Sequence, residues 1–174
     1  RWMVLRATPG PTRVRGTDGW WGRRVAAGIR SRVRCIMRPR AHIRFRLTGA
    51  RAIDMTDASG TLMLDVAGRQ WSQEILRASN VDEALLPRLF ESQEITGEVT
   101  AEGARESGLQ AGIPVVAGAG DQAAGAVGMG IVRPGSVSAT IGTSGVVFAA
   151  TSRPVIEPQG RIPTFCHAIP ERWH

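Results

Sequence analysis

Two short segments contain the residue types that phosphoryl transfer to an alcohol requires. Asp121 follows a Val-rich run closed by glycines, and a carboxylate at such a place can take the proton of a substrate hydroxyl. The second segment, Gly142-Thr143-Ser144-Gly145, follows after about 20 residues and has the glycines and hydroxyls of a turn that aims N–H groups at a phosphate. Together they predict a general base and a phosphate clamp.

Each segment also has a purely structural interpretation. Asp121 could be an aspartate that caps the following helix, and on spacing alone this interpretation has the same weight as a catalytic base. The four residues 142–145 could form an ordinary hairpin turn, and as a bare pattern the turn is the better interpretation. It is their joint occurrence that favours chemistry.

The surrounding pattern predicts the elements that position these two segments. Residues 113–120 are apolar, rich in Val and closed by glycines, which is typical of a buried strand. Residues 121–132 predict a glycine-rich helix, which is tolerable if it packs closely on a neighbour. Ser136–Ile141 and Val146–Ala150 predict the two arms of a β-hairpin. Asp121 would then lie at the carboxyl edge of a strand, where open α/β sheets bind ligands.

The upstream part of the chain predicts helices joined by short loops. The signals are Ile43–Leu47, a short apolar helix or strand end closed by Thr48-Gly49, and a set of cap residues. The predicted caps are Thr56 or Asp57, Ser72, Asn80 with Glu83, and Thr100 with Gly108 at the far end of its helix. Helices followed by a strand, a helix and a hairpin predict the α/β class.

Composition sets wider limits. The chain has 174 residues and 43% hydrophobic residues, enough for a core of one domain or one domain with part of another. It has no apolar run of the roughly 18 residues that span a membrane, and no signal peptide is expected. Two cysteines, Cys35 and Cys166, make no disulfide framework, so the reducing cytoplasm is the expected location. The first residue is not Met, which indicates an incomplete or processed chain.

Charge is unevenly distributed along the sequence. Residues 1–51 contain 14 Arg and one acid, a formal charge of +13, whereas residues 52–174 contain 8 Arg and 14 acids, a charge of −6. Lys is absent, which excludes a Walker-type phosphate lysine and a Schiff-base lysine. Residues 1–33 are either a basic nucleic-acid arm with Trp2, Trp20 and Trp21 as stacking groups or an out-of-frame reading of GC-rich DNA. We favour the second, so nucleic acid is not an expected partner.

Four stretches carry a resemblance to a known family. They are GAGDQAAGAVGMGIVRPGSVSATIGTSGVVFA, RFRLTG, DMTDASGTLMLDV and FCHAIPERWH, in the same order as in that family. The chain resembles the FGGY carbohydrate kinases, and within them the xylulokinase branch, from about residue 34 to residue 174. Residues 1–33 match nothing that we can place.

The resemblance implies a fold, a reaction and a site. The fold would be a partial actin-like, ribonuclease-H-like ATPase fold, with residues 34–132 from the sugar-binding domain and 133–174 from the start of the nucleotide-binding domain. The parent enzyme would transfer the γ-phosphate of ATP, with Mg²⁺, to D-xylulose. Asp121 would be the base, Gln122 and Gly120 would contact the sugar, and Gly142, Thr143, Ser144 and Gly145 would face the phosphates, with Thr143 the most direct ligand.

Departures from the family pattern qualify this expectation. Gln122 stands where xylulokinases usually have Asn, as in glycerol kinases, so glycerol, ribulose or another polyol or ketose is the alternative substrate. The family's N-terminal phosphate hairpin and most of its nucleotide domain are not found. We therefore expect little or no activity from the isolated chain and exposed apolar surface. The full-length parent could be a homodimer.

Several other residues are better explained by structure than by chemistry. Asp54 and Asp57 could be metal ligands, but a helix-capping element is the better interpretation. Cys166 and His167 lack the ligand count of a zinc site, so no residue is assigned to a metal. We expect Met55, Met63 and Trp71 in the core.

Overall fold

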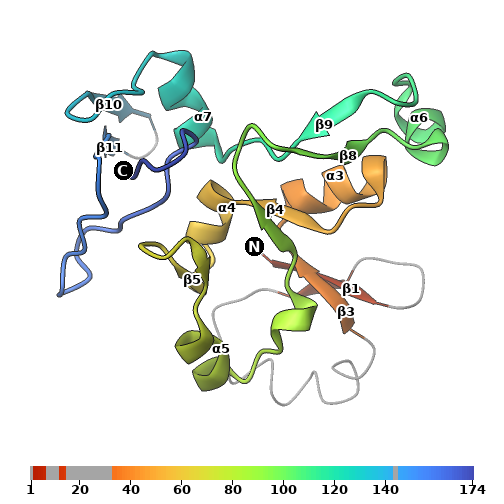
Figure 1. Ribbon diagram of the computed structural model, residues 1–174, viewed down its shortest axis with the longest axis horizontal. Coiled ribbons are helices and arrows are strands. Elements are labelled where there is room, and N and C mark those ends of the chain that lie inside the picture. The colour runs from red at the N-terminus through yellow and green to blue at the C-terminus, as the bar shows by residue number, and fades with distance from the viewer. Residues whose placement is uncertain (1, 7–11, 15–32, 143–144) are drawn as a thin grey trace. The chain divides into compact units, whose positions relative to one another are not determined.

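The structure is a computed structural model that describes residues 2–6, 12–14, 33–142 and 145–174, with side chains from residue 33 onward. Figure 1 shows its helices and strands, coloured from the N-terminus to the C-terminus. The chain divides into two compact units, each assembled from several stretches of sequence. Unit 1 comprises Arg1–Ile53, Gln73–Arg88 and Ile95–Val115, and unit 2 comprises Asp54–Ser72, Leu89–Glu94 and Val116–His174. Every described residue that the sequence assigns to the site belongs to unit 2.

Unit 1 contains an antiparallel three-stranded sheet. Its strands are β1 (Trp2–Arg6), β2 (Thr12–Val14) and β3 (Val33–Met37), in the order β2-β1-β3. Cys35 and Met37 of β3 form a small buried cluster with Ala41 of the following helix α3 (Pro39–Thr48). A strand followed at once by a helix can bury one face of each against the other.

The helix ends of unit 1 confirm two sequence predictions. Helix α3 begins at Pro39, ends at Thr48 and is capped by Gly49, whose left-handed φ of 73° lets its N–H bond to the Phe45 carbonyl at 2.7 Å. Helix α6 (Ala101–Ser107) begins after Thr100, whose hydroxyl accepts the Gly103 N–H at 3.0 Å, and ends at the left-handed Gly108. The two helices lie side by side in Figure 1.

The close approach of α6 to α3 requires a glycine. A Cβ at Gly103 would lie 2.3 Å from the carbonyl oxygen of Leu47, and that oxygen also accepts the Thr100 N–H at 2.9 Å. A backbone carbonyl cannot move aside as a flexible side chain can, so this position admits no side chain.

The predicted capping box at Asn80 and Glu83 is wrong. Asp82 is the cap, because its side chain accepts the Ala84 N–H at 2.9 Å, and it opens only a 3₁₀ turn, η1 (Glu83–Leu85). Asn80 instead has a left-handed φ of 52°, just after helix α5 (Gln73–Ser79), which begins directly after the predicted Ser72. The chain then continues as strand β7 (Arg88–Phe90).

The prediction of a buried strand before Asp121 is half right. Strand β9 (Pro114–Val116) is present and pairs with β8 (Ile95–Glu98), while β4 (Ala52–Asp54) pairs with β7. However, Pro114 is exposed and Val116 is 48% exposed. Within the described residues β9 has a hydrogen-bonded neighbour on one side only, so it lacks the two-sided cover that buries a central strand.

Unit 2 contains short elements around a glycine-rich helix and a hairpin. They are α4 (Met55–Ser59), β5 (Leu64–Asp65), β6 (Gln70–Trp71), α7 (Asp121–Gly128), β10 (Val137–Ile141) and β11 (Gly145–Ala149). Strands β10 and β11 pair antiparallel, from Val137 with Ala149 to Ile141 with Gly145, which confirms the predicted hairpin. Met55 and Trp71 are buried as expected, and Met63 is half-buried.

Helix α7 packs on the hairpin through a small core. Ala126 of α7, Phe148 of β11 and Ala150 are buried together, with Ile131 against them. The glycine-rich helix thus packs on a neighbour as the sequence requires, but through Ala126 and not through Gly125 or Gly128, where a Cβ would meet nothing within 4 Å. In the part of the chain that the structure describes, no helix has the length and apolar character needed to cross a membrane.

Candidate active site

The predicted base lies at the first turn of α7. Asp121 and Gln122 are the first two residues of the helix, and both are exposed. Gly120 is the N-cap, with an extended backbone (φ −58°, ψ 153°), and its carbonyl accepts the first helical bond from the Ala124 N–H at 2.8 Å. The Asp121 carboxylate therefore stands at the positive end of the helix, open to a ligand.

A buried polar segment holds the residue before Asp121. The hydroxyl of Thr56 accepts the Gly120 N–H at 2.6 Å and donates to Oδ1 of Asp54. The same Asp54 oxygen accepts the backbone N–H groups of Thr56 and Asp57, each at 3.1 Å. Asp54 is 1% exposed and Thr56 is 8% exposed. A buried carboxylate thus connects through one hydroxyl to the N-terminus of α7.

These contacts correct the predicted cap and confirm the structural role of Asp54. The cap of α4 is Asp54, not Thr56 or Asp57, because only the residue before the helix can place its oxygen on the N–H groups of the first turn. Thr56 is thereby available for Gly120. Within the described residues no group of three or more His, Cys, Asp or Glu side chains could hold a metal ion.

The backbone leading to Asp121 is fixed at two further points. The Ala117 N–H donates to the Glu94 carbonyl at 2.8 Å, and the Gly118 N–H donates to the Ser92 carbonyl at 2.9 Å. Gly118 has a left-handed φ of 74°, so this position of the turn favours glycine. The approach to Asp121 is therefore constrained before the helix begins.

The other end of α7 is held by a histidine. The carbonyl of Ile131 accepts Nε2–H of His167 at 2.9 Å, while Nδ1 of His167 accepts the Ile169 N–H at 3.0 Å. This pattern assigns the neutral tautomer protonated at Nε2, in agreement with burial, which lowers the pKa of His167. The preceding residue, Cys166, donates its N–H to the Ser59 hydroxyl at 3.0 Å. The segment Asp54–Ser59 therefore connects with both ends of α7.

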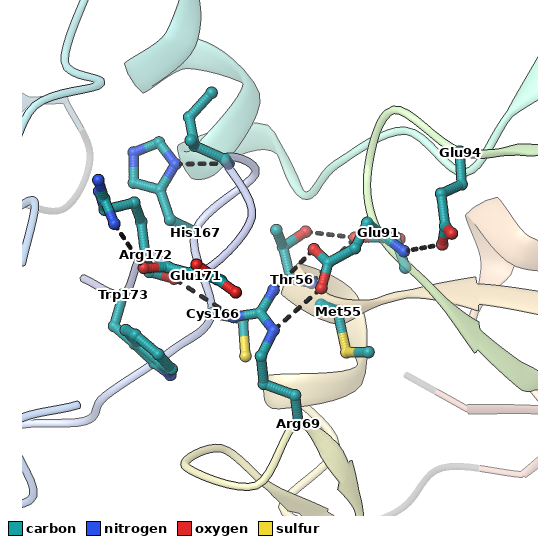
Figure 2. Close-up of polar contacts among 12 residues, drawn as sticks. Met55, Thr56, Arg69, Glu91, Glu94, Cys166, His167, Glu171, Arg172 and Trp173 are labelled. Atoms are coloured by element: carbon teal, nitrogen blue, oxygen red, sulfur yellow. Dashed lines mark hydrogen bonds and ion pairs between the residues drawn. The ribbon is translucent and has the colours of Figure 1, made fainter. Parts of the chain in front are cut away.

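An ion pair joins further stretches of the same unit. Figure 2 shows the Arg69 guanidinium beside the Glu91 carboxylate, with two hydrogen bonds of 3.0 and 2.7 Å. It also donates to the Arg172 carbonyl at 3.4 Å and lies 5.4 Å from the centre of the Trp173 ring. Trp173 in turn donates its indole N–H to the Val66 carbonyl at 2.8 Å. Both ionic side chains are largely buried, so the pair joins three stretches of unit 2.

Cys166 is a structural residue in this arrangement. It is fully buried, and burial raises the pKa of its thiol. A neutral, inaccessible thiol is a poor nucleophile and a poor metal ligand. Both ring nitrogens of the neighbouring His167 are hydrogen-bonded to backbone groups, so neither residue is available for chemistry.

The predicted phosphate turn is only partly described. Gly142 follows β10 and Gly145 begins β11, and both are exposed. Thr143 and Ser144 lie outside the described residues. Among the described residues no hydrogen bond joins Asp121 to Gly142 or Gly145. What brings the two predicted segments into one unit is the packing of Ala126 on Phe148.

Sequence reasoning missed the residues that support the site. Each of three side chains bonds to a backbone group far away along the chain. The pairs are Thr56 with Gly120, Ser59 with Cys166 and His167 with Ile131, which are 64, 107 and 36 residues apart. No local pattern reports such contacts. The only available signal was the density of small polar residues in 54–61, which is unusual for a segment that is buried almost throughout.

The chain is similar in sequence to known carbohydrate kinases. Residues 20–128 match the model of the FGGY family of carbohydrate kinases, N-terminal domain, so the match begins upstream of residue 34. The chain is 43% identical to the xylulose kinase of Escherichia coli (strain K12) over 154 residues, which are 88% of this chain and 32% of that protein. It is 41% identical to the xylulose kinase of Klebsiella pneumoniae over the same shares of the two chains.

Solved structures of two xylulose kinases share the fold of this chain. The crystal structure of a xylulose kinase from Brucella ovis superposes with a TM-score of 0.82 at 41% identity, covering 89% of this chain and 32% of that one. The xylulose kinase from Rhodospirillum rubrum gives 0.81 at 27% identity over 88% of this chain and 31% of that one. The chain spans about a third of the length of the relatives it matches.

Proposed function

Because this chain belongs to the FGGY family of carbohydrate kinases, we propose that it is part of an enzyme that transfers the γ-phosphate of ATP to D-xylulose, giving D-xylulose 5-phosphate. The observation that carries the proposal is the 43% identity to a xylulose kinase, over a segment that includes an exposed carboxylate at the N-terminus of α7. The fold is that of the actin-like sugar kinases, in part. The sugar and the activity are inferences for the whole enzyme.

Asp121 is the proposed general base. It would take the proton from the sugar hydroxyl as the oxygen attacks the γ-phosphorus, which requires a carboxylate that a substrate can reach. The exposure of Asp121 meets that requirement, and the anchors on Ala117, Gly118 and Gly120 fix the backbone that carries it. Gly120 and Gln122 flank the base and are the proposed sugar contacts.

The turn at 142–145 is the proposed phosphate site. Gly142, Thr143, Ser144 and Gly145 would direct backbone N–H groups and hydroxyls to the phosphates of ATP, with Thr143 the most direct ligand. Mg²⁺ would neutralise phosphate charge, and it binds such sites mainly through phosphate oxygens and water. Because the described residues contain no cluster that could enclose a metal, we assign none of them to Mg²⁺. We further propose a cytoplasmic enzyme that could act as a homodimer.

A chimera tests the proposed reaction. Residues 34–174 would replace the matching segment of the Escherichia coli xylulose kinase, and ATP-dependent phosphorylation of D-xylulose, L-ribulose and glycerol would be compared. We expect the highest kcat/KM for D-xylulose. A preference for glycerol or L-ribulose would assign the alternative substrate, and a folded chimera that phosphorylates none of the three would overturn the proposed function.

A single substitution in the chimera tests the base. Asp121→Asn keeps the size of the side chain and removes its basicity, so kcat should fall by about a hundredfold or more while ATP binding persists. The matched control is Asp82→Asn, at an exposed aspartate that caps the turn η1 and should leave turnover unchanged. Turnover retained in Asp121→Asn would reject Asp121 as the base.

A further inference from the structure

The residue that best explains how Asp121 is positioned is Thr56, and its contacts are unusual for a threonine in a short helix. Its hydroxyl makes two hydrogen bonds, one to the Asp54 carboxylate that caps its own helix and one from the distant Gly120 N–H. A hydroxyl has one proton, and an ionised carboxylate only accepts, so Thr56 donates to Asp54 and accepts from Gly120. The direction of both bonds is therefore fixed.

The position of Gly120 makes this contact relevant to the site. Gly120 has no side chain with which to cap α7, and its carbonyl is already used by Ala124. The bond from its N–H to Thr56, at 2.6 Å, is thus the contact that fixes the Ala119–Gly120 peptide, one peptide before Asp121. A Cβ built on Gly120 would lie 3.4 Å from Oγ1 of Thr56 and 3.5 Å from Oδ1 of Asp57, so the turn rests directly on this segment.

The anchor is itself held rigidly. Asp54 accepts two backbone N–H groups as well as the Thr56 hydroxyl, and all the groups concerned are nine-tenths or more buried except Gly120. A bond to a charged acceptor in a buried site polarises the hydroxyl and strengthens the bond that the hydroxyl accepts. Small displacements at a reacting group cost about a hundredfold in rate per ångström.

We infer that Thr56 is a positioning residue. Its hydroxyl links the Asp54 carboxylate to the Gly120 N–H through two hydrogen bonds, which we call the relay. The relay sets the first turn of α7, and with it the carboxylate of Asp121. The inference rests on the proposed function in one respect, namely that Asp121 is the reacting group. The relay itself is a property of this chain, and it can be measured without any activity.

The first experiment measures the relay in the 174-residue chain. Hydrogen exchange of the Gly120 amide, followed by NMR, should be at least about tenfold faster in Thr56→Val, which keeps the shape of the side chain and removes the hydroxyl. Thr56→Ser should restore slow exchange. The matched control is Thr61→Val, because Thr61 is equally buried and bonds only within its own turn, to the Ala58 carbonyl and from the Met63 N–H. It should leave Gly120 unchanged.

The second experiment measures the consequence in the chimera. Thr56→Val should lower kcat by about ten- to a hundredfold with little change in KM for ATP, and Thr56→Ser should recover most of it. Urea unfolding midpoints would be matched against Thr61→Val, so that a general loss of stability cannot explain the result.

The outcomes separate the two proposals. Unchanged Gly120 exchange in Thr56→Val, or a kcat loss equal to that of Thr61→Val, would overturn the positioning role and leave the kinase assignment standing. Fast Gly120 exchange in Thr56→Val would support the relay whatever the activity. If the unsubstituted chimera is at the same time inactive, the proposed function is rejected. Fast exchange together with a kcat loss rescued by Thr56→Ser supports both.

Discussion

The segment 54–61 and the β10–β11 hairpin belong to the same unit, yet the polar segment is buried and much of the apolar hairpin is exposed. The first is rich in polar residues, and Asp54, Thr56, Asp57, Ser59 and Thr61 are all buried. The second is apolar, and Val147 and Ile141 are 75% and 91% exposed. Residue type alone would have assigned the reverse.

Burial of a side chain in this unit depends on the groups that lie opposite it. In segment 54–61 the Asp54 carboxylate and the hydroxyls of Thr56, Ser59 and Thr61 all make hydrogen bonds, as when Ser59 donates to the Met55 carbonyl and accepts the Cys166 N–H. Burial then costs little. In the hairpin, the register places Val137, Ala139, Ile141 and Val147 on one face and Phe148 on the other. Only the face of Phe148 meets α7, so the apolar face stays open among the described residues.

The largest effect should come from removing the one large side chain that the hairpin buries. Phe148→Ala deletes a ring that is 4% exposed, packs on Ala126 and stacks on His174 with centroids 4.0 Å apart, so unfolding should cost about 3–5 kcal/mol less. The neighbouring Val147→Ala should change stability by under about 1 kcal/mol. Urea unfolding of both variants checks this, and equal losses would contradict the assignment of faces.

The polar segment should be the next most sensitive. Asp54→Ala removes a buried carboxylate and leaves two N–H groups and a hydroxyl without their acceptor, for a loss of about 3 kcal/mol. Asp65 is the matched control, since it also accepts two backbone N–H groups, from Ala67 and Gly68, in an exposed turn. Asp65→Ala should cost about 1 kcal/mol. Similar losses from both, by urea unfolding, would show that burial adds nothing to this motif.

A pH effect should follow from the aromatic contacts of the hairpin. Burial and the nearby His167 lower the pKa of His174 to about 4, from an ordinary value near 6.5. The folded state therefore prefers neutral His174, so this stability is complete above about pH 6.5 and is lost as the pH falls toward 4. The loss is on the order of 2–3 kcal/mol.

The variant His174→Phe isolates this effect. It keeps a ring to stack on Phe148 and Phe165, as well as the backbone bonds to Phe165, while removing the titration. Urea unfolding of both proteins at pH 7 and pH 5 should show a smaller drop for the variant. Part of the drop should remain, because burial also lowers the pKa of His167. Identical pH dependence would refute the role of His174.

The smallest change in stability should come from the open face of the hairpin. The double variant Ile141→Thr, Val147→Thr keeps β-branched side chains and removes apolar surface that is already exposed, so unfolding should change by under about 0.5 kcal/mol. Self-association, measured by sedimentation velocity over a range of concentrations, should decrease. A large loss of stability would instead show that this face is covered in solution.

Local signals predicted much of the fold because they act over a few residues. Thr100 and Gly108 bound helix α6, Gly49 follows the end of α3, and Val137–Ile141 pairs with Gly145–Ala149 as a hairpin, all as the sequence indicates. The caps at 54 and 82 were misassigned because several neighbouring polar residues could serve equally well. The cap is the residue whose backbone is extended just before the helix, and the spacing of residue types does not identify that residue.

The family, the order of the elements and the candidate residues Asp121 and 142–145 could be recognised from the sequence, because motifs and caps lie in consecutive residues. The contacts of Thr56, Ser59 and His167, and the exposure of β9 and of one hairpin face, became visible only in the folded chain. These features depend on residues that are far apart in the sequence. Hydrogen bonds across 36 to 107 residues, and the presence of a partner opposite an apolar face, exist only once the chain has folded back on itself.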